Sequence, residues 1–264
     1  MVQDGRTTVT VSTAALKPVR EVGGFFAMSL DALVAIFKRP FALRELVLQT
    51  WFVARVSLLP TMMLAIPFCT LVVFMLNILL GEIGATDASG AGAALGTVNQ
   101  IGPIVTVVVV AGAAATAMCA DLGARTIREE LDAMRVLGID PIQRLVVPRI
   151  LAATVVALML NSIVTMVGLV GSFLFSVYVQ HVTPGAFAAS LTLLVGMPEI
   201  ITAMVKAMLF GLAASLIACY KGTTVGGGAQ GVGNAVNETV VYTFMALFVI
   251  NVLVTAIGLK VSAS

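Results

Sequence analysis

Apolar and charged segments alternate in the middle of the chain: VTVVVVAGAAATAMCA at residues 105–120, DLGARTIREELDAMRVLGIDP at 121–141 and LVVPRILAATVVALML at 145–160. The charged segment holds eight of the chain's 28 acidic and basic residues, which are 15 Lys or Arg and 13 Asp or Glu. Each apolar run extends beyond the quoted letters, and a membrane-spanning helix needs about 20 mostly apolar residues. The pattern therefore predicts two membrane spans joined by a short, densely charged connection.

The composition extends this prediction to the whole chain. Of its 264 residues, 59% are hydrophobic and 11% are charged, and the mean hydropathy is +1.08. A soluble domain of this length carries about 25% charged residues. The deficit indicates that much of the surface faces lipid, which predicts a polytopic membrane protein. Five stretches are apolar for long enough to span a bilayer: residues 55–80, 98–120, 146–177, 191–220 and 235–259.

The Lys and Arg residues predict the orientation of these spans. They concentrate in the N-terminal segment, in the 121–149 connection and at Lys221, whereas the 81–97 and 178–198 connections contain none. Cytoplasmic connections carry an excess of Lys and Arg. The N-terminus is therefore predicted to be cytoplasmic, and five spans leave the C-terminus on the extracytoplasmic side. Lys260 is the one mild contradiction.

The segment before the first span divides into two parts. Residues 1–17 are polar and predict a flexible cytoplasmic N-terminus. In residues 18–48 large apolar residues such as Phe26 and Leu30 recur at helical spacing, and KRP at 38–40 interrupts the run. This pattern predicts an amphipathic helix that lies on the inner leaflet of the membrane. A helix packed against the bundle is the alternative.

The charged connection contains the signals of one short helix. Thr126 followed by Glu129 has the form of a capping box, Gly138 supplies a left-handed closing residue, and Pro141 prevents continuation. The helix is expected over residues 127–137 and is about 16 Å long. It either rests on the lipid headgroups with solvated charges or couples to a groove of a cytosolic partner. Its mixed charge disfavours simple adhesion to anionic lipid, which favours Lys and Arg.

A long motif around this helix, GARTIREELDAMRVLGIDPIQRLVVPRILA at 123–152, resembles the signature of the MlaE/YrbE permease family. IGP at 101–103, FG at 210–211 and CYKG at 219–222 extend the similarity over most of the chain. Members of this family are membrane subunits of ABC transporters that work with MCE-domain proteins on lipids. The resemblance implies an all-α membrane protein, with an N-terminal interfacial helix and a five-span permease domain at 49–264 that contains the coupling helix.

The resemblance also implies the partners. The residues expected to contact the ATPase are Arg128, Glu129, Glu130, Leu131, Asp132, Met134, Arg135, Leu137 and Gly138. The expected partners are a dimer of ABC ATPase subunits, MCE-domain proteins, a lipid substrate and a second YrbE-type permease chain, with no nucleic acid. ADLGARTIREE at 120–130 resembles the A-type YrbE subunit of actinobacterial systems, which is thought to pair with a B-type subunit. The expected location is a bacterial cell membrane.

No cofactor is expected on this chain. The G-x-x-x-x-G-K-[ST] motif does not occur, and KGTTVGGGAQGVG at 221–233 lacks the following Lys-Ser/Thr, so ATP and Mg²⁺ are expected on the partner ATPase. His181 is the sole histidine, and neither HExxH nor G-x-S-x-G is found. Cys69, Cys119 and Cys219 lie in or at the ends of apolar runs and are expected to be buried apolar residues. A permease is favoured over an intramembrane enzyme; a membrane scaffold that recruits a cytosolic protein is the main alternative.

A substrate path is expected within the spans. Lys206 lies inside the fourth predicted span, where an ionisable group is costly and becomes a functional candidate. It either contacts a lipid headgroup, snorkels outward or pairs with Glu199. Many family members carry Arg-Glu where this chain has Asn99 and Gln100, just before Pro103 of the IGP motif. The path residues expected from the resemblance are therefore Asn99, Gln100, Pro103 and Lys206, without the intramembrane charges of those relatives.

Other residues inside the spans predict contacts between helices. The amides of Asn161 and Asn251 are expected to form interhelical hydrogen bonds rather than to line a substrate path. Ala111, Gly112 and Ala115 are small enough to let helix backbones approach closely, either in the core of the bundle or at a seam between subunits.

Overall fold

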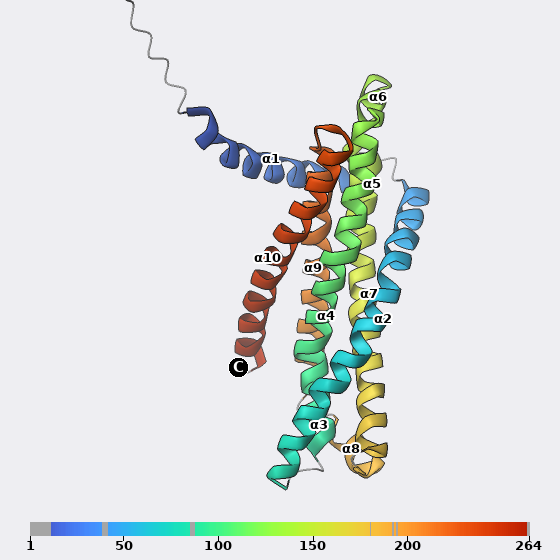
Figure 1. The fold of residues 1–264 in the computed structure, drawn as a ribbon, viewed down its shortest axis with the longest axis vertical. Helices are drawn as coiled ribbons and strands as arrows, with labels where there is room; N and C mark the ends of the chain where they lie inside the picture. Colours follow the sequence, from blue (N-terminus) through green and yellow to red (C-terminus); the bar gives the residue numbers. More distant parts are fainter. Residues whose placement is uncertain are drawn as a thin grey trace, which may run out of the picture.

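The computed structural model describes residues 12–38, 42–84, 88–179, 181–191, 193 and 195–262. Every regular element in these ranges is helical, as the sequence predicts (Figure 1). The elements in chain order are α1 (Ser12–Ile36), α2 (Leu43–Glu82), α3 (Ser89–Gly96), the π-helical turn η2 (Thr97–Ile101), α4 (Gly102–Val109), the π-helical turn η3 (Val110–Ala115), α5 (Thr116–Ile127), α6 (Glu130–Val136), the π-helical turn η4 (Ile142–Val146), α7 (Val147–Tyr178), α8 (Pro184–Ser190), α9 (Met197–Thr223) and α10 (Gly228–Ser262).

Five helical stretches are long and apolar enough to cross a membrane, which confirms the predicted number of spans. They cover Leu43–Glu82, Ser89–Ile127, Ile142–Tyr178, Met197–Thr223 and Gly228–Gly258. The second stretch is the most buried: 61% of its most apolar part lies inside the protein, whereas the value for the fifth is 11%. The second span therefore forms the centre of the bundle. The fifth lies at its edge and leaves most of its apolar surface for lipid or for another chain.

Small residues let the helices of the bundle approach one another closely. A Cβ atom at Gly211 of α9 would lie 2.6 Å from the Cα of Thr154 in α7, so the two backbones are nearly in contact there. In the central span, Ala111 and Ala115 are completely buried in the main hydrophobic core. These two alanines therefore serve the core of the bundle, which was one of the two roles predicted for them.

The N-terminal helix α1 lies across the bundle at a large angle to the spans (Figure 1). It contacts the bundle through small residues, since Ala32 and Ala35 are buried in a cluster with η4 and α7. Large apolar side chains such as Phe26 and Leu30 are exposed on its other sides. The helix is thus both amphipathic and docked on the bundle. It begins at Ser12, within the predicted flexible segment, of which residues 1–11 lie outside the described part of the chain.

The second half of the predicted interfacial region is instead the beginning of the first span. α1 ends at Ile36, and α2 begins at Leu43 and continues to Glu82 without interruption. The predicted break at KRP therefore separates two helices of different direction (Figure 1).

The predicted capping box is wrong. Thr126 lies within α5, and its hydroxyl donates to the backbone carbonyls of Leu122 and Gly222, both at 2.9 Å. α5 therefore continues to Ile127, and the charged helix α6 begins only at Glu130. Glu129 sits between the two helices in a left-handed conformation with φ +58°. Thr126 does not cap the expected helix over 127–137 because its own backbone is still part of α5, where its hydroxyl bonds to carbonyls one turn back and on α9.

The predicted end of the charged helix is confirmed. Gly138 has φ +74°, and its N–H donates to the carbonyl of Arg135 at 3.0 Å. The N–H of Ile139 donates to the carbonyl of Met134 at 2.9 Å. These two bonds form a Schellman motif, which satisfies the last carbonyls of the helix. Pro141 then precedes η4 and the third span, so the proline begins a new helical segment as well as ending the old one.

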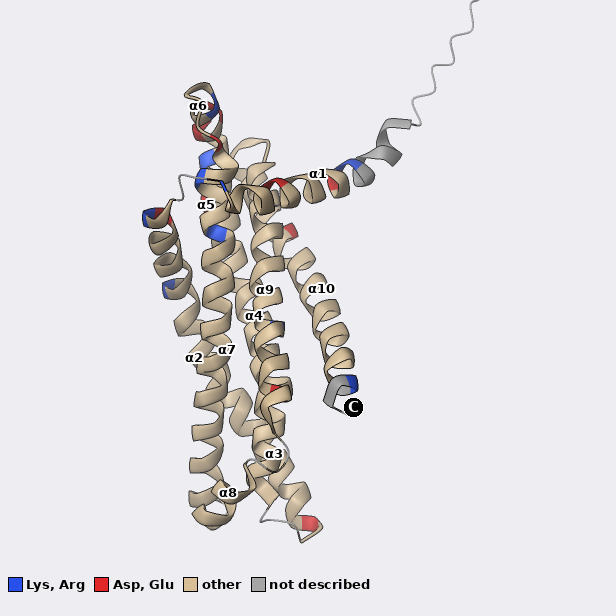
Figure 2. Ribbon diagram, turned by 180° about the vertical axis from the view of Figure 1, so that it is seen from behind, with Lys and Arg blue, Asp and Glu red and all other residues tan. Residues whose placement is uncertain are grey.

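Most of the charged residues lie toward one end of the bundle (Figure 2). This end, called the α6 end, carries α6, the C-terminal ends of α5 and α9, and the N-terminal ends of α7 and α10 (Figure 1). The short helices α3 and α8 lie at the other end, the α8 end. Such segregation is expected of a membrane bundle with one positively charged side.

Candidate functional site

The tip of α6 combines charged and apolar side chains that are open to solvent. Arg128 Nε lies 3.0 Å from Glu130 Oε1, and Arg135 Nη1 lies 2.7 Å from Asp132 Oδ1. The side chains of both pairs are largely exposed, so they add little to stability. At the end of the helix, Leu137 is 74% exposed and Val136, its neighbour, 88%. Two large apolar side chains are therefore open to solvent at the end of a charged helix.

The inner side of α6 is anchored to several helices at once. Leu131 is 4% exposed, and Met134 packs beside it. Their cluster contains residues of α1, α5, η4, α7 and α9: Ala32, Ala35, Leu122, Leu145, Val146, Val147, Ile150 and Cys219. Leu131 is therefore buried and Met134 partly buried, whereas Ile127 and Leu137 are exposed.

A buried ion pair joins the base of α5 to α7. Arg149 is 0% exposed; its Nη2 donates to Asp121 Oδ2 and its Nη1 to the carbonyl of Leu145 at 2.9 Å. Asp121 also faces Arg125 Nε at 3.4 Å, on the more exposed side. In the sequence, Arg149 counts only among the Lys and Arg residues of the 121–149 connection that predict the orientation of the spans. The available signal was a basic residue inside the apolar run of the third span, which requires a buried partner.

A second connection joins α5 to α9. The Thr126 hydroxyl donates to the carbonyl of Gly222, and a Cβ at Gly222 would lie only 2.8 Å from the Cβ of Leu122. Together with the Asp121–Arg149 pair, this contact holds the α6 ends of α5, α7 and α9 as one unit.

Two of the predicted path residues meet inside the bundle. Lys206 is 2% exposed, and its Nζ donates to the backbone carbonyl of Asn99 in η2 at 3.3 Å. Lys206 therefore neither snorkels outward nor forms an ion pair with Glu199, whose Oε2 accepts the N–H of Gly196 at 2.9 Å. Lys206 is thus an ionisable residue buried inside a span, which makes it a candidate functional residue.

The other two predicted path residues point elsewhere. Gln100 is exposed on the surface of the bundle, and Pro103 is buried within the central span. Sequence reasoning did not predict a groove of about 350 Å³ between η2, α7 and α9, lined mainly by apolar side chains. Asn161, 2% exposed, lies in its wall, and the Asn161 Oδ1 has no hydrogen-bond partner among the described residues. The interhelical hydrogen bond predicted for this amide oxygen is absent there.

Comparison with known proteins identifies the family. The family model for permease MlaE matches residues 46–257. A probable ABC transporter permease protein of Rickettsia typhi is 29% identical over 252 residues, which cover 95% of this chain and 97% of the relative. TRIGALACTOSYLDIACYLGLYCEROL 1, a chloroplastic protein of Arabidopsis thaliana, is 33% identical over 168 residues, or 64% of this chain and 48% of the relative.

A third relative is the intermembrane phospholipid transport system permease protein MlaE of Haemophilus influenzae. It is 26% identical over 181 residues, which cover 68% of this chain and 69% of the relative. The matched segment of the family model includes all five long apolar helices in whole or in large part. The chain is therefore a multi-pass membrane permease subunit of the ABC-transporter class, rather than an enzyme, and it belongs to the MlaE permease family.

Proposed function

We propose that this chain is the transmembrane subunit of an ABC-type lipid transporter. It moves hydrophobic substrates, such as fatty acids, phospholipids or sterols, between MCE-domain proteins and the membrane. The name of the Haemophilus relative, a phospholipid transport permease, supports the substrate class. The single observation that carries the mechanism is α6, an exposed charged helix whose inner side is fixed to the spans.

In this proposal α6 is the coupling helix that a separate ATPase dimer moves. ATP and Mg²⁺ bind to that dimer, and this chain contributes no nucleotide-binding motif. The exposed side chains of α6 and its flanks meet the ATPase: Arg128, Glu129, Glu130, Asp132, Arg135, Leu137 and Gly138. Leu131 and Met134 transmit the motion, because they are held in the cluster that joins α1, α5, α7 and α9.

The α6 end is the cytoplasmic side in this proposal. The concentration of Lys and Arg at this end supports the assignment (Figure 2). The N-terminus then lies in the cytoplasm and the C-terminus on the extracytoplasmic side of a bacterial cell membrane, where MCE-domain proteins supply or receive the lipid.

Lys206 and Asn99 form the centre of the proposed lipid path. The Lys206 ammonium has one carbonyl partner in the described structure and can attract an anionic headgroup. The neighbouring groove between η2, α7 and α9 has apolar walls that suit an acyl chain. Lys206 and Asn99 lie beside this groove rather than in its wall, since their chain neighbours Ala203 and Val98 line it. Gln100 and Pro103 belong to the same turn and helix start and extend the path from there.

A second permease chain completes the proposed transporter. The most apolar part of the fifth span is less buried than that of any other span, which supports a contact with another subunit along α10. The sequence of residues 120–130, ADLGARTIREE, favours an actinobacterial A-type YrbE subunit paired with a B-type chain. Copurification of identical subunits alone, from cells that contain both chains, would contradict the pairing.

The coupling role is tested by changing the charge pattern of α6. Glu130→Lys combined with Arg135→Glu reverses two charges, and copurification of the ATPase and lipid uptake are both expected to fall. The exchange Asp132→Arg with Arg135→Asp keeps an oppositely charged pair three residues apart, and therefore keeps the helix, while it reverses the pattern presented to a partner. Glu82→Lys, at the exposed α8 end of α2, is the matched control.

The results separate a transporter from a membrane scaffold. Loss of ATPase association together with loss of uptake in both α6 variants supports coupling. Loss of association with unchanged uptake supports the scaffold. No effect of either variant on association removes α6 from the interface with the ATPase.

A further inference from the structure

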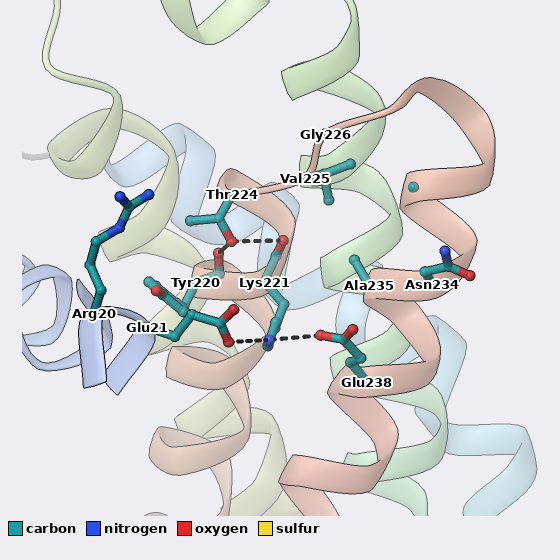
Figure 3. Close-up of a pocket in the computed structure, with 11 residues that line it drawn as sticks. Arg20, Glu21, Tyr220, Lys221, Thr224, Val225, Gly226, Asn234, Ala235 and Glu238 are labelled. Atoms are coloured by element: carbon teal, nitrogen blue, oxygen red, sulfur yellow. Dashed lines mark hydrogen bonds and ion pairs between the residues drawn. The ribbon is translucent and has the colours of Figure 1, made fainter. Parts of the chain in front are cut away.

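A polar pocket of about 400 Å³ lies at the α6 end, away from the Lys206 path. Three helices form it: α1 contributes Arg20 and Glu21, α9 contributes Lys221, and the beginning of α10 contributes Asn234 and Glu238 (Figure 3). Its volume is in the range of sites that bind small molecules. Nothing in the proposed coupling or lipid path uses these residues.

The pocket carries two positive and two negative side chains in an alternating arrangement. Lys221 Nζ lies 2.7 Å from Glu238 Oε2 and 3.6 Å from Glu21 Oε2 (Figure 3). The Lys221 side chain is 13% exposed, whereas those of Glu21 and Glu238 are 59% and 53% exposed. Arg20 forms no ion pair with any described acidic residue. The pocket thus offers a ligand one guanidinium without an ion pair in the described structure and two half-exposed carboxylates, each of which also faces Lys221.

The surroundings of the pocket are apolar. α1 crosses the bundle beside the beginning of α10, so the two helices form a corner (Figure 1). On α1, the side chains of Val22 and Phe26 are exposed, and on α10 those of Tyr242 and Met245 are exposed. A ligand with a polar head and an apolar body can therefore place its head in the pocket and its body along α10.

We propose that this pocket binds the headgroup of a zwitterionic phospholipid that carries a primary ammonium, as in phosphatidylethanolamine. Arg20 holds the phosphate, because a guanidinium matches phosphate oxygens in geometry and charge. Glu21 and Glu238 accept N–H bonds from the ammonium. A purely anionic headgroup could use Arg20 but would leave the two half-exposed carboxylates, which share only the Lys221 ammonium, without a further cation. A choline headgroup has no N–H to donate. This inference rests on the proposed lipid function only for the biological role of the site, because the headgroup can bind whether or not the chain transports lipid.

Native mass spectrometry of the full chain in detergent tests the proposal. Phosphatidylethanolamine, phosphatidylcholine and phosphatidylglycerol with identical acyl chains are titrated onto delipidated protein. Phosphatidylethanolamine is expected to bind about three- to tenfold more tightly than the other two, as one charge-assisted hydrogen bond at a half-exposed site would give. Glu21→Gln with Glu238→Gln should abolish this preference, and the control Glu82→Gln should retain it.

Arg20→Gln provides a second variant that breaks no ion pair of the described structure. It should weaken the binding of all three lipids, because all three carry the phosphate that Arg20 holds, while the preference for phosphatidylethanolamine remains. Equal binding of all three lipids by the unaltered chain, or a preference that survives the double glutamate variant, would overturn the proposal. If soluble glycerophosphoethanolamine displaces the lipid at similar concentrations, the acyl chains contribute nothing, and the proposal that the ligand is a membrane lipid is overturned. Lipid transport by the complete assembly is measured separately, so each proposal can fail without the other.

Discussion

The Asp121–Arg149 pair offers the sharpest test of how the α6 end is held together. Asp121→Ala leaves the Arg149 guanidinium without its carboxylate, although the side chain is 0% exposed and its Nε already lacks a partner in the described structure. Breaking a buried pair by removing one partner costs about 3–5 kcal/mol. Asp121 is 32% exposed, so water can replace part of what it supplies. The free energy of unfolding is therefore expected to fall by about 3 kcal/mol, the lower end of the range.

Arg149→Met should be much less harmful than Asp121→Ala. Replacement of a buried charge by an apolar residue of similar volume is often neutral, and Asp121 keeps water and Arg125 as partners. A loss of about 1 kcal/mol or less is expected, and Asp121→Ala combined with Arg149→Met should resemble Arg149→Met alone. Arg125→Met, which removes the partially exposed partner of the same carboxylate, is the control and should cost below about 1 kcal/mol.

These stabilities are measured by reversible unfolding of the purified chain in mixed micelles, monitored by circular dichroism. The decisive result is the asymmetry between the two partners. The reasoning attributes the lost stability to the buried Arg149 guanidinium that is left without a partner. Equal losses of unfolding free energy for Asp121→Ala and Arg149→Met, or a double variant as unstable as Asp121→Ala, would refute it.

Three further predictions concern backbone contacts and the lipid path. Gly211→Ala should lower stability by about 1–3 kcal/mol, because a Cβ would meet α7 at 2.6 Å; Gly171→Ala, with nothing within 4 Å, is the control, and equal effects would contradict the close crossing. Glu129→Gly should raise the melting temperature and Gly138→Ala should lower it, because both positions have positive φ, which glycine adopts without strain. Each change is worth about 1 kcal/mol. Shifts of the same sign would disprove the left-handed backbone at one of the two positions. Lys206→Met should keep the fold, because the site is buried, while lipid uptake falls by about tenfold or more as one charged contact is lost; unchanged uptake would exclude Lys206 from the path.

Local sequence patterns predicted the large features of the fold and several of its boundaries. The five spans follow from hydropathy, because the need to bury apolar groups in lipid acts on each segment by itself. Gly138 predicted the end of α6 for a similar reason, since a left-handed residue closes a helix through bonds within a few residues. The burial of Cys69, Cys119 and Cys219, which are all free thiols, was also readable from their apolar neighbours.

The features that sequence reasoning missed depend on residues far apart in the chain. Thr126 has the sequence context of a cap, but the carbonyl of Gly222, 96 residues away, binds its hydroxyl and lets α5 continue. Lys206 finds its partner in the carbonyl of Asn99, 107 residues away, rather than in Glu199 on its own helix. Asp121 and Arg149, 28 residues apart, likewise meet only when α5 packs against α7.

The sequence by itself therefore determined that the chain is a five-span helical permease with a short charged helix between its second and third spans. Only the tertiary structure decided where that helix begins, which side chains hold it to the bundle, and which polar groups inside the bundle pair with one another. The physical reason is the range of the interactions. Hydropathy and turn chemistry act over a few residues, whereas a buried polar group takes whichever partner the packing of distant helices brings within hydrogen-bonding distance.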